Sequence, residues 1–350
     1  MNIVAFSKAW SNKAPILITG HTGFKGTWLS LLLKELGVDV VGYSLRATEH
    51  SMYRRLGLEG SIPEIFADIR DESLMFDFLT AHKPSAIIHL AAQPLVIDSY
   101  KNPKETFEIN VIGTANLLQA ASKVSEIEAV VISTTDKVYR NENVDRKFIE
   151  SDPLEGIDPY SASKVATEAV IRAWQNILEG QVRIISGRAG NVIGGGDYSE
   201  NRLIPDCVRS HESNSLLAIR NPYSIRPWQH VLEPLAGYLI ALGFGREHSY
   251  NFGPKEDLNL NVIEVVEIFS KKLEFQYQIL GSKNRQYEAT WLSLDSTFAE
   301  KKLNWRPTYT QTEAINLTGE WWNVALSGGD VENFTRLQIR NFIALQEANV

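Results

Sequence analysis

The sequence has very little cysteine: Cys207 is the only cysteine among its 350 residues. No intrachain disulfide can form, and we expect no metal site, because a structural zinc site needs several Cys or His ligands. The opening residues, MNIVAFSKAWSNK, lack the basic start, apolar run and small cleavage residues of a signal peptide. No apolar run is long enough to span a bilayer. We therefore expect a cytoplasmic protein that does not contact membranes.

The sequence also lacks an excess of basic residues. It has 35 Lys and Arg against 42 Asp and Glu, which gives a net charge of −7. A general nucleic-acid binder needs a basic surface, so we do not expect one. An anionic small molecule remains open, because a few arginines suffice to bind it. The length suggests two joined domains, and the composition is typical of a soluble globular enzyme.

A glycine-rich turn follows the first predicted strand. An apolar run at 16–19 ends in Gly20, Gly23 and Gly26, and an apolar helical pattern covers 24–36. In this context Gly20 allows a positive φ, Gly23 lets a pyrophosphate approach the backbone, and Gly26 permits close helix packing. The free N–H groups at the start of the helix then favour an anion. The alternative is a turn that merely needs glycine, because a glycine triplet alone is a weak signal.

Strand and helix patterns alternate through the first half of the chain. This order predicts an α/β fold, a doubly wound parallel sheet of the Rossmann type with ligands at the carboxyl ends of its strands. The predicted strands are 16–19, 38–43, 62–67, 86–90, 129–133 and 182–186, and the predicted helices between them are 24–36, 72–82, 101–123 and 159–178.

The alternation ends near Gly190, where glycines, prolines and aromatic residues interrupt shorter elements. We expect a dinucleotide-binding domain at 1–190, with 229–253 packing back on it. Residues 191–350 should form mainly a second, smaller, mixed α/β domain that binds the substrate. Its predicted helices are 232–243, 258–272, 311–325 and 335–347.

The strongest chemical signal is Tyr160-Ser-Ala-Ser-Lys164. Residues four apart lie on one helical face, so both side chains can point into one cleft. A neighbouring ammonium favours the phenolate form of a tyrosine, which can then accept a proton from a hydroxyl group. The alternative is a solvated helix that carries an unrelated tyrosine and lysine.

With the glycine turn, this pair resembles the extended short-chain dehydrogenase/reductase family. The resemblance implies that Tyr160 is the catalytic base, that Lys164 also holds the nicotinamide ribose, and that NAD is the cofactor. Asp68 and Ile69 match the family's adenine contact, although Asp68 could equally cap a helix or turn. The implied cofactor-binding residues are Gly20, Thr22, Gly23, Phe24, Gly26, Ser44, Asp68, Ile69, Ala91, Ala92, Tyr160 and Lys164.

One position departs from the usual NAD pattern. An acidic residue commonly follows the second strand and holds the ribose diol, but this chain has Ser44 and then Arg46. By that rule Arg46 hints at the 2′-phosphate of NADP, or it is a surface charge. The resemblance to NAD-dependent enzymes favours NAD.

The segment Ser133-Thr-Thr135-Asp136-Lys137 stands at the end of the fifth strand. In nucleotide-sugar 4,6-dehydratases, a branch of the same family, this place reads Thr-Asp-Glu. There the Thr assists the Tyr, the Asp expels the C6 hydroxyl, and the Glu takes the C5 proton. Lys137 replaces the glutamate, so either neutral Lys137 is the base or charged Lys137 stabilises the enolate. The alternative is a surface ion pair of little value.

Further segments narrow the resemblance to the dehydratases of CDP-glucose: ITGHTGFKGTWLSLLL, HLAAQPLV, YSASK, RAGNVIGGGD and RPWQHVLEPLAGYL. This implies a hydro-lyase that makes CDP-4-keto-6-deoxy-glucose for bacterial surface deoxysugars such as O-antigen. Arg226 would pair with the substrate diphosphate through its planar guanidinium. His21 and Lys25 also match, although both could simply lie in a solvated loop. The implied substrate-binding residues are Gln93, Asn110, Asn191, Asn201, Arg202, Arg226 and His230.

Other functions stay open. A C4 epimerase or a dehydratase for another nucleotide would share everything up to Thr135. A non-catalytic dinucleotide sensor would keep the glycines but has no need of Tyr160, Lys164 and Asp136. Asn110 could shape the active site or only make an interhelical hydrogen bond. The family resemblance also implies a homodimer through the helices at 101–123 and 159–178.

Overall fold

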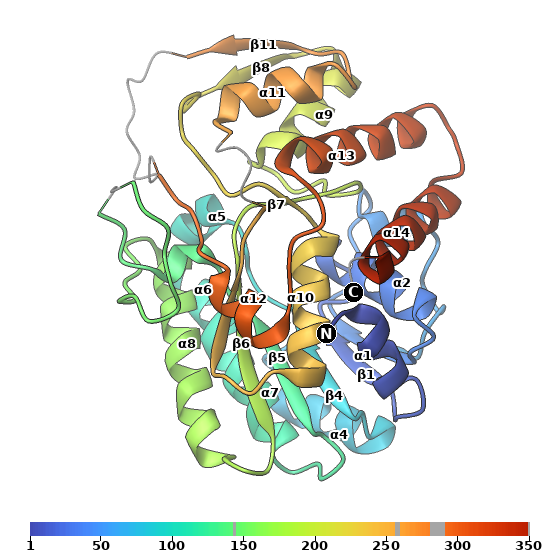
Figure 1. The fold of residues 1–350 in the computed structure, drawn as a ribbon, viewed down its shortest axis with the longest axis vertical. Helices are drawn as coiled ribbons and strands as arrows, with labels where there is room; N and C mark the ends of the chain where they lie inside the picture. The colour runs from blue at the N-terminus through green and yellow to red at the C-terminus, as the bar shows by residue number, and fades with distance from the viewer. Residues whose placement is uncertain (143–144, 256–259, 281–290, 349–350) are drawn as a thin grey trace.

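The computed structural model describes residues 1–142, 145–255, 260–280 and 291–348 (Figure 1). Its centre is a seven-stranded sheet in the order β10-β6-β5-β4-β1-β2-β3, and every neighbouring pair is parallel. The predicted doubly wound α/β fold is therefore confirmed. The strands are β1 (Ile16–Thr19), β2 (Val40–Ser44), β3 (Glu64–Phe66), β4 (Ala86–His89), β5 (Ala129–Ser133), β6 (Arg183–Ala189) and β10 (Ser249–Phe252).

Helices cover both faces of this sheet (Figure 1). Successive side chains of a strand point to opposite faces, so Leu17 and Val130 join one buried cluster while Ile16 and Val131 join the other. A strand that is buried on both faces needs apolar residues throughout, which explains the uninterrupted apolar runs in the sequence. The helices in this layer are α1 (Ile3–Trp10), α2 (Phe24–Glu35), α3 (Met52–Arg55), α4 (Glu72–His82), α5 (Val96–Lys101), α6 (Pro103–Phe107), α7 (Gly113–Ala121), α8 (Pro159–Ile177) and α10 (Leu232–Phe244).

The predicted helix at 101–123 is broken in the structure. Asn102 has φ −131° and ψ 65° and separates α5 from α6, which begins at Pro103. A proline disfavours helical backbone in the residue before it but fits the first position of a helix. A π-helical turn, η1 (Glu108–Ile112), then joins α6 to α7.

The seventh strand, β10, is absent from our sequence prediction. It pairs in parallel with β6, from Ser249 opposite Ser186 to Phe252 opposite Ala189. The preceding helix α10 packs on β5 and β6. Residues 232–252 therefore belong to the layer of the central sheet, although they follow Gly190 in the chain. The domain boundary near Gly190 stays a prediction.

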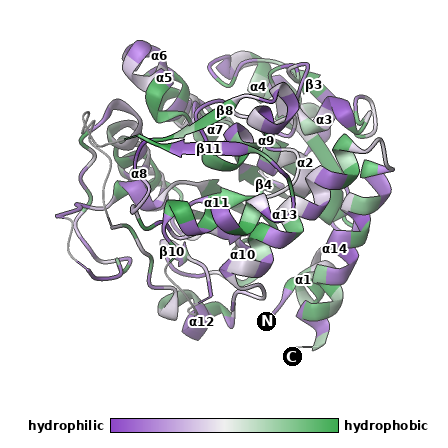
Figure 2. Cartoon of the chain, turned by 90° about the horizontal axis from the view of Figure 1, so that it is seen from above, coloured by the Kyte–Doolittle hydropathy of each residue, from purple (hydrophilic) through white to green (hydrophobic). Residues whose placement is uncertain are grey.

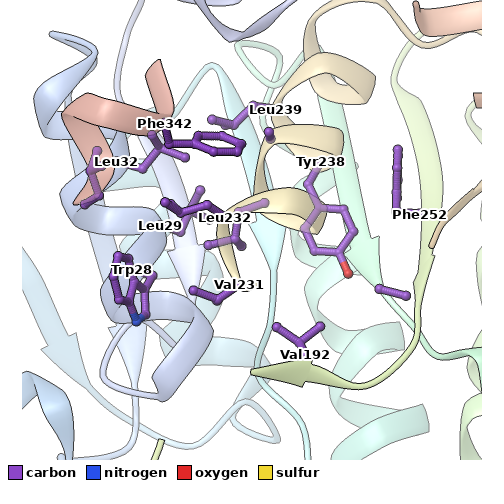
Figure 3. Packing of buried hydrophobic residues seen from close by; sticks show 14 of the residues in the cluster. Trp28, Leu29, Leu32, Val192, Val231, Leu232, Tyr238, Leu239, Phe252 and Phe342 are labelled. Carbon is purple, nitrogen blue, oxygen red and sulfur yellow. The ribbon is translucent and has the colours of Figure 1, made fainter. Parts of the chain in front are cut away.

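The packing of α10 ties distant parts of the chain together (Figure 3). Leu232 and Leu239 of α10 lie beside Leu29 and Leu32 of α2, and Phe342 of α14 completes this buried group. Figure 2 shows α14 beside α1, and both chain ends lie together there. The Asn2 Nδ2 atom donates to the Gln346 carbonyl at 2.9 Å.

A smaller lobe lies over the carboxyl ends of the strands, at the top of Figure 1. It contains two short parallel pairs, one of which is β8 with β11 and the other β7 with β9. The bounds of its elements and of the C-terminal helices are β7 (Val192–Ile193), α9 (Leu203–Ser213), β8 (Leu216–Ile219), β9 (Gln229–His230), α11 (Val262–Ser270), β11 (Gln276–Ile279), α12 (Thr297–Leu303), α13 (Gln311–Leu326) and α14 (Val331–Ala348).

Candidate active site

A cavity of ≈ 1240 Å³ lies between the sheet and the smaller lobe. This volume exceeds the usual range for one small ligand and leaves room for two. The predicted site residues that line it are Gly20, Thr22, Gly23, Phe24, Gly26, Ser44, Asp68, Ile69, Ala91, Ala92, Thr135, Asp136, Lys137, Tyr160, Lys164, Asn191, Asn201, Arg202 and Arg226.

The glycine turn is shaped by close backbone contacts. Gly20 has φ +75°, and a Cβ there would lie 2.8 Å from the Ala91 backbone nitrogen. A Cβ on Gly26 would lie 2.1 Å from the Gly20 carbonyl oxygen. Gly23 precedes α2 without a side-chain cap, so the first N–H groups of the helix are left for a ligand. The turn therefore fits a phosphate at the helix start.

Asp68, which follows β3 and lines the same cavity, has its carboxylate held by an arginine. Arg70 donates from Nε to Oδ1 at 3.0 Å and from Nη2 to Oδ2 at 2.7 Å. These bonds lower the pKa of Asp68. The hydroxyl of Thr22, in the glycine turn, lies 2.8 Å from that of Ser44, the last residue of β2. Arg46 lies outside the cavity lining, with its guanidinium 4.5 Å from the centre of the Phe66 ring.

Tyr160 and Lys164 occupy the first two turns of α8 and face the cavity. Asp158 and Ser161 form a capping box at the start of this helix, which fixes its first turn. The Lys164 ammonium donates to the Ser133 carbonyl at 3.1 Å. The spacing prediction thus places both side chains in one site, at the end of β5.

Burial changes the acidity of both groups. It raises the pKa of Tyr160 to about 12, although a hydrogen bond with Thr135 and the charge of Arg202 oppose the change. Burial lowers the pKa of Lys164 to about 8, against the attraction of Glu168. In the absence of ligands the phenol is therefore protonated, and its use as a base requires further positive charge nearby.

Thr135, Asp136 and Lys137 follow β5 and enter a short 3-10 turn, η2 (Asp136–Val138). The Thr135 hydroxyl donates to Asp136 Oδ1 at 2.9 Å, and Asp136 is 1% exposed. Burial raises the pKa of Asp136, which favours its protonated, acidic form. Among the described residues, the Asp136 Oδ2 atom has no hydrogen-bond partner.

Three predicted substrate residues do not line the cavity. Gln93 uses its amide to hold Leu95 and Thr106, and Asn110 bonds the Gln93 backbone and donates to Ser163 Oγ at 2.9 Å. Asn110 therefore makes the interhelical hydrogen bond named as its alternative.

His230 is the third of these residues, and it is fully buried. Its ring packs edge-on against Trp28 and Tyr309, with centroids 5.5 and 5.7 Å away. His230 lies two residues before the apolar helix α10. Because α10 packs in the core, the imidazole of His230 is buried there as well. None of these three residues lines the cavity, and each contacts neighbouring residues instead.

His21 and Lys25 are not in a solvated loop. The His21 ring is buried, and its Nε2 atom lies 2.6 Å from Glu64 Oε2. Lys25 lines the cavity, with its ammonium 5.7 Å from the centre of the Tyr238 ring. Burial and the charges of Arg202 and Lys164 lower the pKa of Lys25 to about 7. The turn therefore brings into the cavity an amine whose charge changes near neutral pH.

A buried ion pair behind the site is missing from our sequence interpretation. Glu168 receives Arg188 Nε and Nη2, each at 2.9 Å, and also the hydroxyls of Thr134 and Ser186. The signal was available in part, because Glu168 continues the four-residue spacing of Tyr160 and Lys164. Its partner Arg188 comes from β6 and could be recognised only after folding.

Among the described residues, no cluster of His, Cys, Asp and Glu side chains could hold a metal ion. In the part of the chain that the structure describes, no helix has the length and apolar character needed to cross a bilayer.

Comparison with known proteins gives consistent matches over most of the chain. The family model described as GDP-mannose 4,6 dehydratase matches residues 17–318. The chain is 38% identical to a CDP-glucose 4,6-dehydratase of Salmonella typhimurium, over 96% of this chain and 97% of that protein. It is 26% identical to a dTDP-glucose 4,6-dehydratase of Xanthomonas campestris, over 87% and 92%.

A solved dTDP-glucose 4,6-dehydratase of Streptomyces venezuelae, with NAD bound, superposes with a TM-score of 0.79 and 25% identity. The match covers 90% of this chain and 99% of that one.

Proposed function

The chain belongs to the GDP-mannose 4,6-dehydratase family of extended short-chain dehydrogenases/reductases, and we propose that it converts CDP-D-glucose to CDP-4-keto-6-deoxy-D-glucose and water. The observation that carries the proposal is the meeting of Tyr160, Thr135 and Asp136 in the cavity that the glycine turn also lines. The 38% identity to the Salmonella enzyme supports CDP-glucose among the nucleotide sugars.

We propose NAD as the cofactor of this lyase. The glycine turn would hold its diphosphate, Asp68 its adenine and Lys164 its nicotinamide ribose. The glycines fit this role because a Cβ on Gly20 or Gly26 would collide with backbone. Bound NAD supplies a reversible acceptor for the C4 hydride of the sugar. Arg46 lies outside the cavity lining and contacts Glu59 and the Phe66 ring, which supports NAD over NADP.

Oxidation at C4 begins with Tyr160. Its phenolate accepts the proton of the C4 hydroxyl group, and Thr135, which lines the same cavity, assists it. Lys164 adds positive charge from the next helical turn. A positively charged ligand beside Tyr160 lowers the pKa of the phenol and offsets the effect of burial. A positioned base of this kind is worth roughly 10²–10⁴-fold in rate.

Elimination of water follows, because the new C4 ketone acidifies the C5–H bond. We propose that neutral Lys137 removes this proton, with stabilisation of the enolate by charged Lys137 as the alternative. Asp136 then protonates the departing C6 hydroxyl. Its burial supports this role, since a raised pKa keeps the carboxyl group protonated.

The substrate diphosphate would be bound from the smaller lobe. Arg226 is buried and lines the cavity, with Nη1 donating to the Ile225 carbonyl at 2.8 Å. Arg202, Asn191 and Asn201 line the same region. A guanidinium suits a diphosphate because its planar fork can make two parallel hydrogen bonds.

The decisive experiment follows isotopes through the reaction. CDP-glucose deuterated at C4 should give a 4-ketone product that carries the label at C6, with no net NADH. Stoichiometric NADH would indicate a simple dehydrogenase, and a faster reaction of dTDP- or UDP-glucose would assign another substrate. The Lys137→Met variant should still oxidise C4 but should not incorporate solvent deuterium at C5. Unchanged C5 exchange would remove Lys137 from the mechanism.

We also propose that the protein is a cytoplasmic homodimer whose product feeds deoxysugar synthesis for surface polysaccharides. The exposed apolar side chains of Tyr100, Phe107 and Ile112, on α5, α6 and η1, support an interface at these helices. Sedimentation analysis should give twice the chain mass, and the Ile112→Glu variant should give the monomer.

A further inference from the structure

The proposed mechanism divides the chemistry between two parts of the chain. Tyr160, on α8, acts at C4 of the sugar, whereas Asp136 and Lys137, in the turn η2, act at C6 and C5. These carbons are neighbours in one sugar, so η2 and α8 must keep a fixed separation during the reaction. A misplacement of ~1 Å can cost about 10²-fold in rate. This requirement rests on the proposed function.

Two residues that flank the reacting segment hold it in place, and we call them the anchors of η2. The first anchor, Thr134, precedes the segment. Its hydroxyl donates to Glu168 Oε1 at 2.7 Å, and its backbone N–H donates to the Gly187 carbonyl of β6 at 2.9 Å. Because Glu168 lies on α8, this anchor ties the start of the segment to the helix of Tyr160.

The second anchor, Tyr139, directly follows η2. Its backbone N–H donates to the Asp136 carbonyl at 3.4 Å. Its phenol donates to Asn251 Oδ1 at 2.7 Å and accepts Arg188 Nη1 at 2.9 Å. Its ring stacks on Phe148, with the ring centroids 5.1 Å apart. The side chain therefore holds the end of the turn on three sides.

One ion pair receives both anchors. Arg188 Nε and Nη2 bond the two carboxylate oxygens of Glu168, and the remaining nitrogen, Nη1, bonds Tyr139. Such a two-pronged guanidinium–carboxylate pair has a fixed, planar geometry. Both members of the pair and both anchors are buried, so water does not readily replace a lost bond.

We propose that the Glu168–Arg188 pair positions the η2 turn relative to α8. Neither member of the pair lines the cavity, so the pair acts through the two anchors and not on the substrate itself. Loss of one anchor leaves Tyr160 in place on its helix but allows the acid and the base of η2 to move. Oxidation at C4 then proceeds, while elimination of water is slowed.

The test removes one hydroxyl at a time. Tyr139→Phe keeps the ring, Thr134→Val keeps the volume, and Thr134→Ser restores a hydroxyl. Single turnovers of the NAD-loaded enzyme with CDP-glucose are followed by NADH absorbance and by quenching for the 4-keto-6-deoxy product. Because C6 can take up the hydride only after water has left, the decay of NADH reports elimination.

The two steps should separate in the variants that lack an anchor. In Tyr139→Phe and in Thr134→Val, NADH should form at nearly the unmodified rate but decay about tenfold more slowly. Thr134→Ser should behave as the unmodified enzyme does.

Tyr250→Phe is the matched control. Tyr250 is also buried, and its phenol oxygen accepts the backbone N–H groups of Arg246 and Glu247 at 3.2 Å each, but it does not line the cavity. This variant should lower the melting temperature and leave both NADH rates unchanged. Melting temperatures of all variants separate a loss of stability from a loss of positioning.

Equal slowing of NADH formation and decay in Tyr139→Phe, or no change in either rate, would overturn the positioning role alone. Slow decay in Thr134→Ser, matching that of Thr134→Val, would also contradict it, because the hydroxyl would then be irrelevant. If the unmodified enzyme forms no 4-ketone from CDP-glucose, the proposed function is rejected together with the positioning role.

Discussion

Glu168 on α8 and Glu233 on α10 are both buried, but their surroundings favour opposite ionisation states. Burial alone would raise the pKa of Glu168, yet the hydrogen bonds and charge of Arg188 lower it. Burial raises the pKa of Glu233 to about 8, although the backbone N–H groups of Tyr309 and Thr308 and the more distant charge of Lys255 oppose the change. Among the described residues, Glu233 Oε2 has no hydrogen-bond partner.

The difference shows that a charge partner, more than depth of burial, decides whether a carboxyl group stays ionised here. It also separates two uses of a buried acid. Glu168 lies one turn beyond Lys164, and its charge opposes the lowering of that lysine's pKa by burial. Glu233 holds the backbone at Thr308 and Tyr309 against α10 and does not line the cavity. One acid supports the chemistry and the other supports the packing of the C-terminal segment.

The largest effect is expected for Arg188→Met, which leaves Glu168 buried without a cation. Loss of one partner of a buried pair costs about 3–5 kcal/mol, because the remaining charge is uncompensated. The pKa of Glu168 should then rise, as that of Glu233 does. Unfolding by urea should show the full loss at pH 8 and a smaller loss at pH 5, where Glu168 can take up a proton.

Arg140→Met is the control for this variant. Arg140 bonds Glu155 at 2.7 Å, but both side chains are half exposed, so stability should change little. An equal loss in both variants would show that the buried pair has no special weight.

Glu233→Gln removes the ionisable group of the second buried acid. The folded-state pKa of about 8 lies above 4.5, the ordinary value of a glutamate, so the folded protein binds more protons between these values. Stability from this group is complete below pH 4.5, falls across the window and is lost as the pH rises through 8. The variant should match the unmodified protein near pH 5 and exceed it by roughly 2–4 kcal/mol at pH 9.

Glu313→Gln is the matched control. The stability of both variants and of the unmodified protein is measured by thermal unfolding from pH 5 to pH 9. Glu313 caps α13, and the Thr310 backbone N–H lowers the pKa of its carboxyl group, so the pH slope of this group has the opposite sign. Parallel pH profiles of Glu233→Gln and the unmodified protein would contradict the prediction.

The features predicted well from the sequence depend on near neighbours in the chain. Gly20 requires its positive φ, and the strand–turn–helix from 16 to 36 follows from local apolar patterns. Tyr160 and Lys164 meet because a helix brings residues four apart together. The structure places these groups in one cavity, while their roles in catalysis remain proposals.

The features missed or misplaced depend on contacts between distant segments. His230 is buried by Trp28 and Tyr309, which stand far from it in the chain. Arg188 reaches Glu168 across the boundary between β6 and α8. The strand β10 has only four residues and is defined by its pairing with β6. Sequence periodicity describes neighbouring residues, so it cannot identify a contact with a residue from a distant segment of the chain.

The smallest effect is expected at a third carboxylate, Glu35, which is paired at the protein surface. It accepts Arg336 Nη1 and Arg340 Nε, each at 2.7 Å, and joins α2 to α14. The Arg340 side chain is 60% exposed, so Arg340→Met should cost less than about 1 kcal/mol. Arg336 remains to hold the carboxylate, which is why the loss should be small.

Salt and acid should separate this surface pair from the buried one. Burial would raise the pKa of Glu35, but its two arginines lower it, so their stabilisation is present at neutral pH and is lost as the pH falls through the folded-state value. At about 1 M salt, where the Debye length is ~3 Å, the deficit of Arg340→Met should vanish. The deficit of Arg188→Met should persist, because water and ions do not reach Glu168. Equal salt sensitivity in the two variants would show that burial does not shield the Glu168–Arg188 pair.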